Sequence, residues 1–246
     1  METVSELFRT LNTTYGFDLS IFYDSYDADL FTRGMYFTAL LSAASVFGSL
    51  FLGVIGAYLQ FNGGVVARKF VSAYIQVFRN TPPLIQLYFF FFALGPSLTS
   101  ATGMSEPILS NVAWAIVSLT LYAGAFNIEV FRSGVEAVPA ATIEAADSLG
   151  LSKRQTFLQI ILPLAFRISL PGLNNNLVNL IKTTTNAYAI AVPELLYGAS
   201  QVWSDKLNAL EMMIVLLIVY TAVIGLFTWM MGCIERKLAV PGWGRA

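Results

Sequence analysis

Several asparagines of this sequence stand at helical spacing, and their amide side chains could bind a polar solute. On a helix, Asn175, Asn179 and Lys182 stand at positions i, i+4 and i+7, so they share one face, with Asn176 and Thr183 beside it. Amides offer both donors and acceptors, which a zwitterion needs when it crosses a low-dielectric barrier. We therefore predict that this face lines a translocation pathway. One alternative stays open: the asparagines bridge two helices across a dimer interface.

The composition removes most other chemistry. The 246 residues contain no His, and Cys233 is the single Cys, so the chain alone cannot form a zinc site, a His-dependent triad or a disulfide. No Gly-x-x-x-x-Gly-Lys-Ser/Thr string is present, so we expect ATP to bind a partner. A formal net charge of −1 gives no basic field for nucleic acid. We expect neither enzyme activity nor a metal or cofactor in this chain.

The elements that must position these residues are membrane helices. Hydrophobic residues make up 56% of the chain and charged residues only 12%, against about 25% charged in an ordinary soluble domain. Crossing a bilayer takes roughly 20 apolar residues. Runs at 34–59, 108–128 and 212–234 are charge-free, while segments 70–94 and 156–181 contain prolines and polar residues, which indicates that these two face the protein interior or a pathway. The predicted spans are 34–59, 70–95, 107–130, 156–181 and 210–234.

The distribution of charge predicts the orientation. The first 33 residues are acidic, and the loop 95–107 has no Lys or Arg. Basic residues lie in the alternate segments: Arg68, Lys69, Arg132, Lys153, Arg154, Arg236, Lys237 and Arg245. The positive-inside rule then places the loop 131–155 and the tail 238–246 in the cytoplasm. Residues 1–33 are predicted to form an external tail, with a short amphipathic helix on the membrane surface rather than a cleavable signal peptide.

The cytoplasmic loop 131–155 contains explicit helix signals. Pro139 suits the first turn of a helix and Gly150 suits the left-handed position after its end, which predicts a helix of about three turns. Ser152 and Gln155 form a capping box that starts the next helix at a new angle. On shape alone, this loop could simply join two spans.

A specific string within this loop points to a family. The string begins with Glu144-Ala145-Ala146, followed after three residues by Gly150, after nine more by Ile160 and after one more by Leu162-Pro163. This spacing matches the EAA motif of ABC-importer membrane subunits. The stretch 79–86, Arg-Asn-Thr-Pro-Pro-Leu-Ile-Gln, is similar to the Arg-Gly-Thr-Pro-Leu-Leu-x-Gln stretch of the polar amino-acid branch. Segments 122–134 and 171–185 also resemble this branch, and the resemblance runs from about 34 to 237. Asn176 and Thr183 depart from the Glu and Asp that the branch often has, which argues against a strongly cationic ligand.

The resemblance implies an all-α type I ABC importer permease fold, with five transmembrane helices and a cytoplasmic coupling helix. Glu144, Ala145, Ala146 and Gly150 would dock onto an ATP-binding subunit, present in two copies that hold the ATP and Mg²⁺. Alternating access would move polar amino acids or close derivatives, delivered by an extracytoplasmic solute-binding protein, across the bacterial inner membrane. A second permease chain, identical or related, is implied, and we slightly favour a related one.

Three alternatives remain. Within the same class, the solute could be an opine, a compatible solute or an anion. An ATP-independent transporter is disfavoured because the three long spans lack ionisable residues at their centres, and a membrane enzyme because no span holds clustered carboxylates. We interpret Arg79, Glu129 and Arg167 as structural charges, and the small residues Ser45, Ser49, Gly53 and Ala57 as a helix-packing stripe.

Overall fold

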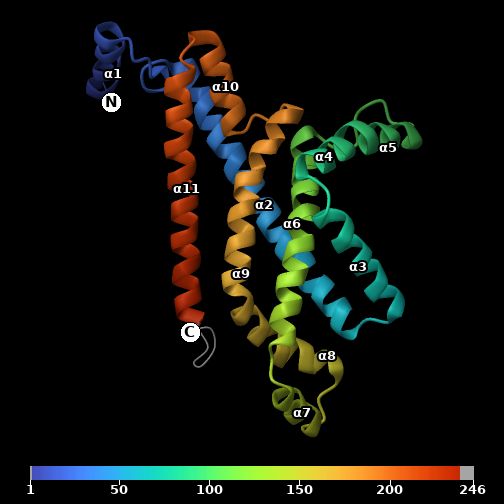
Figure 1. Ribbon diagram of the computed structural model, residues 1–246. Helices are drawn as coiled ribbons and strands as arrows, with labels where there is room; N and C mark the ends of the chain where they lie inside the picture. The colour runs from blue at the N-terminus through green and yellow to red at the C-terminus, as the bar shows by residue number, and fades with distance from the viewer. Residues whose placement is uncertain (1, 239–246) are drawn as a thin grey trace. The chain divides into compact units, whose positions relative to one another are not determined.

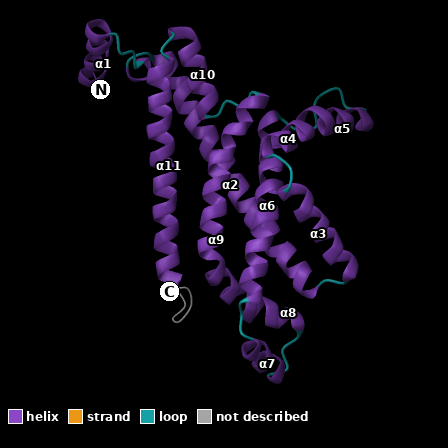
Figure 2. Cartoon of the chain, viewed as in Figure 1, coloured by secondary structure: helices purple, strands orange, loops and turns teal. Residues whose placement is uncertain are grey.

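The computed structural model describes residues 2–238, with side chains from Ser5 onward, and every regular element in that range is a helix (Figure 2). The α-helices are α1 (Glu2–Tyr15), α2 (Ser25–Asn62), α3 (Val65–Arg79), α4 (Pro83–Tyr88), α5 (Gly95–Thr102), α6 (Asn111–Glu136), α7 (Ala140–Ser148), α8 (Lys153–Gln155), α9 (Leu162–Thr183), α10 (Leu195–Lys206) and α11 (Ala209–Leu238). Two π-helical stretches, η2 (Phe89–Leu94) and η3 (Thr156–Ile161), and two 3₁₀ stretches, η1 (Ser20–Phe22) and η4 (Thr184–Ile190), join them (Figure 1). The predicted all-α class is confirmed.

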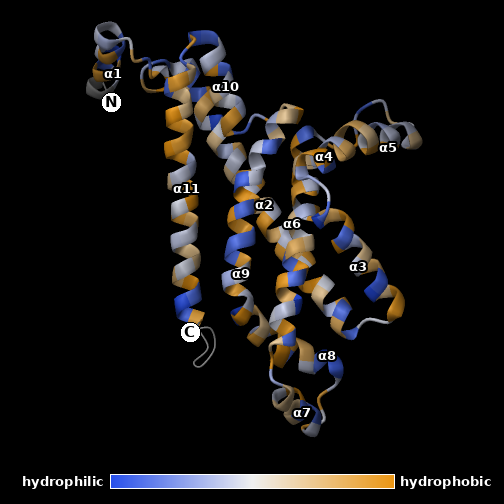
Figure 3. Cartoon of the chain, viewed as in Figure 1, coloured by the Kyte–Doolittle hydropathy of each residue, from blue (hydrophilic) through white to orange (hydrophobic). Residues whose placement is uncertain are grey.

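Five helical segments of the described chain are long and apolar enough to cross a membrane, as predicted. They are Ser25–Asn62, Pro83–Thr102, Asn111–Glu136, Lys153–Ile190 and Ala209–Leu238. Figure 3 shows the contrast between them: α11 is apolar along most of its length, whereas α9 carries several hydrophilic residues. Residues 239–246 of the predicted C-terminal tail, including Arg245, lie outside the described residues.

The second predicted span, 70–95, is wrong in its position. The helix ends at Arg79 and a new one begins at Pro83, because Pro82 and Pro83 have no backbone N–H to continue a helical ladder. The Gln86 amide closes this corner by donating to the carbonyl oxygens of Phe78 (2.9 Å) and Thr81 (3.0 Å). The apolar segment long enough to span is therefore Pro83–Thr102, with α3 as a separate amphipathic helix.

The predicted external tail 1–33 also needs correction, since α2 begins at Ser25 rather than near 34. Asp24 starts this helix early, because its Oδ1 atom accepts the backbone N–H groups of Tyr26 (2.9 Å) and Asp27 (3.4 Å). The tail itself contains a second helix, α1. The helix 25–33 thus extends α2 beyond the charge-free run.

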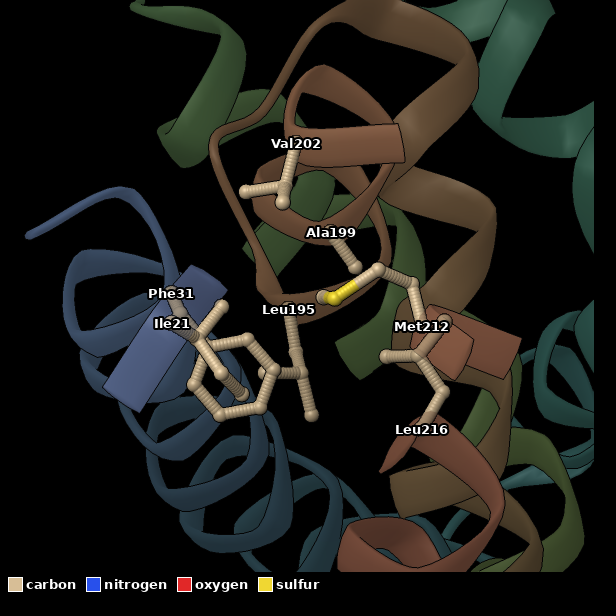
Figure 4. Close-up of a cluster of buried hydrophobic side chains, with 7 residues drawn as sticks. All are labelled: Ile21, Phe31, Leu195, Ala199, Val202, Met212 and Leu216. Atoms are coloured by element: carbon tan, nitrogen blue, oxygen red, sulfur yellow. The ribbon is translucent and has the colours of Figure 1, made fainter. Parts of the chain in front are cut away.

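The chain divides into two compact units. The first comprises the residues up to 43, 87–116 and 181–225, and the second comprises 44–86, 117–180 and the residues from 226. In the first unit, Phe31 of α2 and Met212 of α11 approach Leu195 of α10 in a buried cluster (Figure 4). This cluster fixes α10 against the beginnings of α2 and α11.

In the second unit, α2 packs closely on α6. A Cβ atom at Gly53 would lie 2.8 Å from the Phe131 ring, and Ser45, Ser49 and Ala57 are buried. The small-residue stripe therefore serves helix packing, as predicted.

Candidate docking helix and pathway face

Helix α7 has the start and the end that the sequence predicts. Pro139 stands at the N-cap, one position before the first helical residue, and its carbonyl accepts the Thr142 N–H (3.0 Å). Gly150 follows the helix with a left-handed φ of 74°. The capping box is present, since the Ser152 N–H donates to Gln155 Oε1 (2.9 Å) and the Gln155 N–H donates to Ser152 Oγ (3.4 Å). The result is a short, rigidly bounded helix between α6 and α8 (Figure 1).

One side of α7 rests on its own chain. Ala146 is 3% exposed, and Ile143 packs against a buried cluster that includes Phe157 and Ile161 of η3. The opposite side is open: Glu144, Ala145 and Gly150 are exposed, and Leu149 is 80% exposed. Among the four residues predicted to dock, the side chain of Ala146 is covered by its own chain, whereas Glu144, Ala145 and Gly150 are exposed. Docking by these residues stays a prediction.

The amides predicted to line a pathway lie on α9. Asn175 and Asn179 are exposed on one side of this helix, and Lys182, exposed as well, follows at the spacing of the same face. Asn179 Nδ2 donates to the hydroxyl of Tyr122 on α6 (3.3 Å). Asn176 and Thr183 are half-buried and stand to the side of this face.

The exposed side of α9 is polar, although α9 belongs to a membrane-spanning segment, in which lipid would favour apolar residues. Arg167 extends the same exposed side, eight residues before Asn175, while Leu173 and Leu177 on the other side are buried. Exposed amides and charges in a membrane-spanning helix require protein or water around them. This face therefore meets either a water-filled pathway or a second protein chain, the two alternatives that the sequence left open.

An ion-pair network in the second unit extends beyond the charges singled out in the sequence. Arg79 Nη1 lies 3.3 Å from Glu129 Oε2, and the same oxygen lies 3.2 Å from Arg132 Nη2. Arg132 Nη1 also lies 2.6 Å from Glu136 Oε1. Spacings of three and four residues on one helix could have revealed Arg132 and Glu136 as partners of this network. The structure supports a structural role for Arg79 and Glu129, which hold α3 to α6.

A cavity of about 480 Å³ lies beside this network, between α2, α3 and α6. Its polar lining includes Gln60, Arg68, Gln76, Glu129, Arg132 and Glu136. Opposite charges alternate on its wall, so it has no strong preference for an anion or a cation. Among the described residues, no group of three or more His, Cys, Asp or Glu side chains could hold a metal ion.

Sequence reasoning also missed Glu194, a buried carboxylate in the first unit. It caps α10, because its carboxylate oxygens accept the backbone N–H groups of Leu196 (3.0 Å) and Tyr197 (2.9 Å). The Tyr220 hydroxyl donates to it as well (3.2 Å). Burial raises the pKa of Glu194 to about 7, although these three donors act in the opposite direction. No helix was predicted at 195–206, and Glu is not one of the favoured N-cap residues, so no local signal marked this carboxylate.

Residues 49–240 match the family described as binding-protein-dependent transport system inner membrane component. The chain belongs to this family. Among curated relatives of this inner membrane component, the L-cystine transport system permease protein TcyL of Bacillus subtilis is 30% identical over 81% of this chain and 82% of its own. The probable glutamine ABC transporter permease protein GlnM of the same organism is 30% identical over 82% and 89%. The glutamine transport system permease protein GlnP of Escherichia coli is 28% identical over 86% and 94%.

Solved structures confirm the fold of this inner membrane component. A chain of an amino acid ABC transporter crystallised with histidines superposes with a TM-score of 0.73, at 24% identity, over 85% of this chain and 94% of that one. A chain of the inward-facing MetNI methionine ABC transporter gives a TM-score of 0.67, at 22% identity, over 86% and 97%. The predicted ABC importer permease fold is therefore confirmed.

Proposed function

We propose that this permease is the membrane-spanning subunit of an ATP-driven importer for polar amino acids or close derivatives. The names of its relatives support this substrate class, since they are permeases of cystine or glutamine transport systems. In this proposal, a separate subunit hydrolyses ATP in two copies, and a solute-binding protein delivers the cargo. The permease resides in a bacterial inner membrane, with its N-terminus outside and its C-terminus in the cytoplasm.

The observation that carries the substrate class is the exposed amide face of α9. Asn175 and Asn179 provide donors for a carboxylate and acceptors for an ammonium group, and they add no buried net charge. Lys182 on the same face adds a positive charge that suits the carboxylate end of such a solute. Transport by alternating access would expose this face first to one side of the membrane and then to the other.

The exposed side of α7 supports the coupling to ATP hydrolysis. Glu144 offers a carboxylate for an Arg or Lys of the partner, and Ala145 lets the partner approach closely. Gly150 adopts the left-handed conformation that turns the chain sharply after α7, which leaves the exposed side of α7 free for the partner. Because each ATP-binding subunit would receive one α7, the complex needs a second permease chain, either a copy of this one or a related one.

The experiment is uptake by proteoliposomes that contain the purified complex and its solute-binding protein. We expect labelled glutamine, cystine or another polar amino acid to accumulate only with ATP. The Asn175→Ala/Asn179→Ala variant should lower uptake by about tenfold or more, because two hydrogen bonds to charged groups are lost. Val223→Ala, at an exposed apolar position of α11, is the control and should transport normally.

Two results would contradict the proposal. If the double variant transports every amino acid of the panel at the normal rate, α9 does not line the pathway. If an opine or a quaternary ammonium compound accumulates and no amino acid does, the substrate class is wrong, although the importer function stands.

A further inference from the structure

Helix α1 is amphipathic, and its apolar side is only partly covered. Leu7, Leu11 and Tyr15 stand four residues apart and form one stripe, while Glu6 and Arg9 lie on the other side. Leu7 is 57% exposed and Tyr15 is 78% exposed. This helix lies outside the region that matches the family, residues 49–240, so the transport function does not account for it.

The edge of α1 beside this stripe is fixed to the segment that follows. Phe8 stacks on Phe22 of η1 with ring centroids 4.4 Å apart, and Asn12 Nδ2 donates to the Tyr23 hydroxyl (2.8 Å). The Arg9 guanidinium lies over the Tyr23 ring at 5.8 Å from its centroid. Helix α1 and residues 18–23 therefore form one small folded element rather than a loose tail.

That element is held at the point where two membrane helices begin. Asn208, just before α11, donates to the Asp18 carbonyl oxygen (3.0 Å). Lys206, at the end of α10, forms ion pairs with Asp24 (3.2 Å) and Asp27 (3.6 Å) at the start of α2. Residues 16–24 alone separate α1 from α2, so α1 stays close to the bilayer surface.

We propose that α1 lies in the membrane interface, with its stripe of Leu7, Leu11 and Tyr15 inserted among the lipids of the leaflet at which α2 begins. The apolar surface continues through Phe17 and Phe22, which are 37% and 48% exposed, to Tyr26 in the first turn of α2, which is 63% exposed. Among them, Tyr is typical of membrane–water interfaces, because its ring is apolar and its hydroxyl is polar. Exposed apolar side chains thus occur from α1 through to the first turn of a membrane span.

The charges of α1 indicate which property of the lipid it recognises. The sequence of α1 has Glu2 and Glu6 against the single cation Arg9, so it carries no excess of positive charge. Without such an excess the helix gains little from anionic headgroups, so apolar insertion holds it. Binding should therefore be the same in zwitterionic and in anionic membranes.

Site-directed spin labelling of the full complex in lipid nanodiscs tests this inference. Cys233→Ser removes the native thiol, and single cysteines are introduced as Leu7→Cys, Tyr15→Cys and, as the matched control, Thr13→Cys. Thr13 is exposed and lies about 160° around the helix from Tyr15. All three positions are exposed, so the labels do not disturb a core.

In phosphatidylcholine nanodiscs, labels at 7 and 15 should be accessible to oxygen and protected from a water-soluble nickel chelate, and the label at 13 should show the reverse. Adding phosphatidylglycerol should change nothing. Equal chelate accessibility at all three sites would overturn the proposal, as would protection that requires phosphatidylglycerol. Protection at 7 and 15 that begins only when the solute-binding protein is added would overturn it too, since the stripe would then be a protein contact. None of these readouts depends on the transported solute.

Discussion

Gly134 of α6 lies against the main chain of α9 at Ala165. A Cβ atom at position 134 would lie 2.7 Å from the Ala165 carbonyl oxygen and would also collide with the hydroxyl oxygen of Ser169. That hydroxyl donates to the Val130 carbonyl on α6 (3.1 Å), so a side-chain hydrogen bond joins the same two helices. This close approach supports the end of α6, from which the chain continues into α7.

Gly134→Ala should force α6 and α9 apart. The contact is with backbone, which cannot rotate away, so we expect a loss of about 1–3 kcal/mol in the free energy of unfolding. A lower melting temperature in detergent would show it. Gly232→Ala in α11 is the control, because nothing lies within 4 Å of its Cβ position, and it should be neutral or slightly stabilising. Identical melting temperatures for the two variants would contradict this prediction.

Glu144→Lys should weaken docking of the ATP-binding subunit without affecting membrane insertion. Reversing this exposed charge on α7 replaces an attraction to a partner Arg or Lys by repulsion. Co-purification of the ATP-binding subunit with the tagged permease measures the effect. Glu106→Lys makes the same charge change in the exposed loop before α6, and the 26 residues of α6, about 39 Å of helix, separate the two loops. Full recovery of the ATP-binding subunit with Glu144→Lys would refute the docking role of α7.

Glu129→Gln should destabilise the chain by about 1 kcal/mol or more, because two arginines lose their shared carboxylate at the same time. Exchanging the charges, Arg79→Glu with Glu129→Arg, should not restore stability, since the new arginine would face Arg132. The control is Arg33→Gln, which breaks an exposed pair with Asp29 (3.8 Å) and should change the free energy of unfolding by less than about 0.5 kcal/mol. Restored stability in the exchanged variant would show that Arg132 is not part of the network.

The stability of the first unit should depend on pH through Glu194. Burial raises the pKa of its carboxyl to about 7 in the folded chain, above the value of an unfolded chain. The protonated form is therefore favoured by folding, and its contribution is complete below about pH 4.5 and is lost as the pH rises through about 7. Relative to Glu194→Gln, the melting temperature of the wild-type chain should fall between pH 5 and pH 8. Parallel melting curves across this range would show that Glu194 does not titrate there.

Much of the fold was predictable from local patterns. Uninterrupted apolar runs predicted three spans well, and Pro139, Gly150 and the Ser152–Gln155 box predicted the limits of α7 and the start of α8. Prediction failed where polar capping extended a helix beyond its apolar run, as Asp24 does for α2. It also failed at 70–95, where the apolar length was counted across the proline break.

The sequence by itself determined the class of the protein, the number of its membrane helices and the presence of α7, because apolar length, backbone freedom and capping depend on residues close together in the chain. Only the tertiary structure decided that Ala146 faces inward while Glu144 faces outward, that Glu129 binds an arginine 50 residues away, and that Glu194 is buried beneath Tyr220. These outcomes depend on which helix faces meet. That choice belongs to the packing of the whole chain, which no single segment specifies.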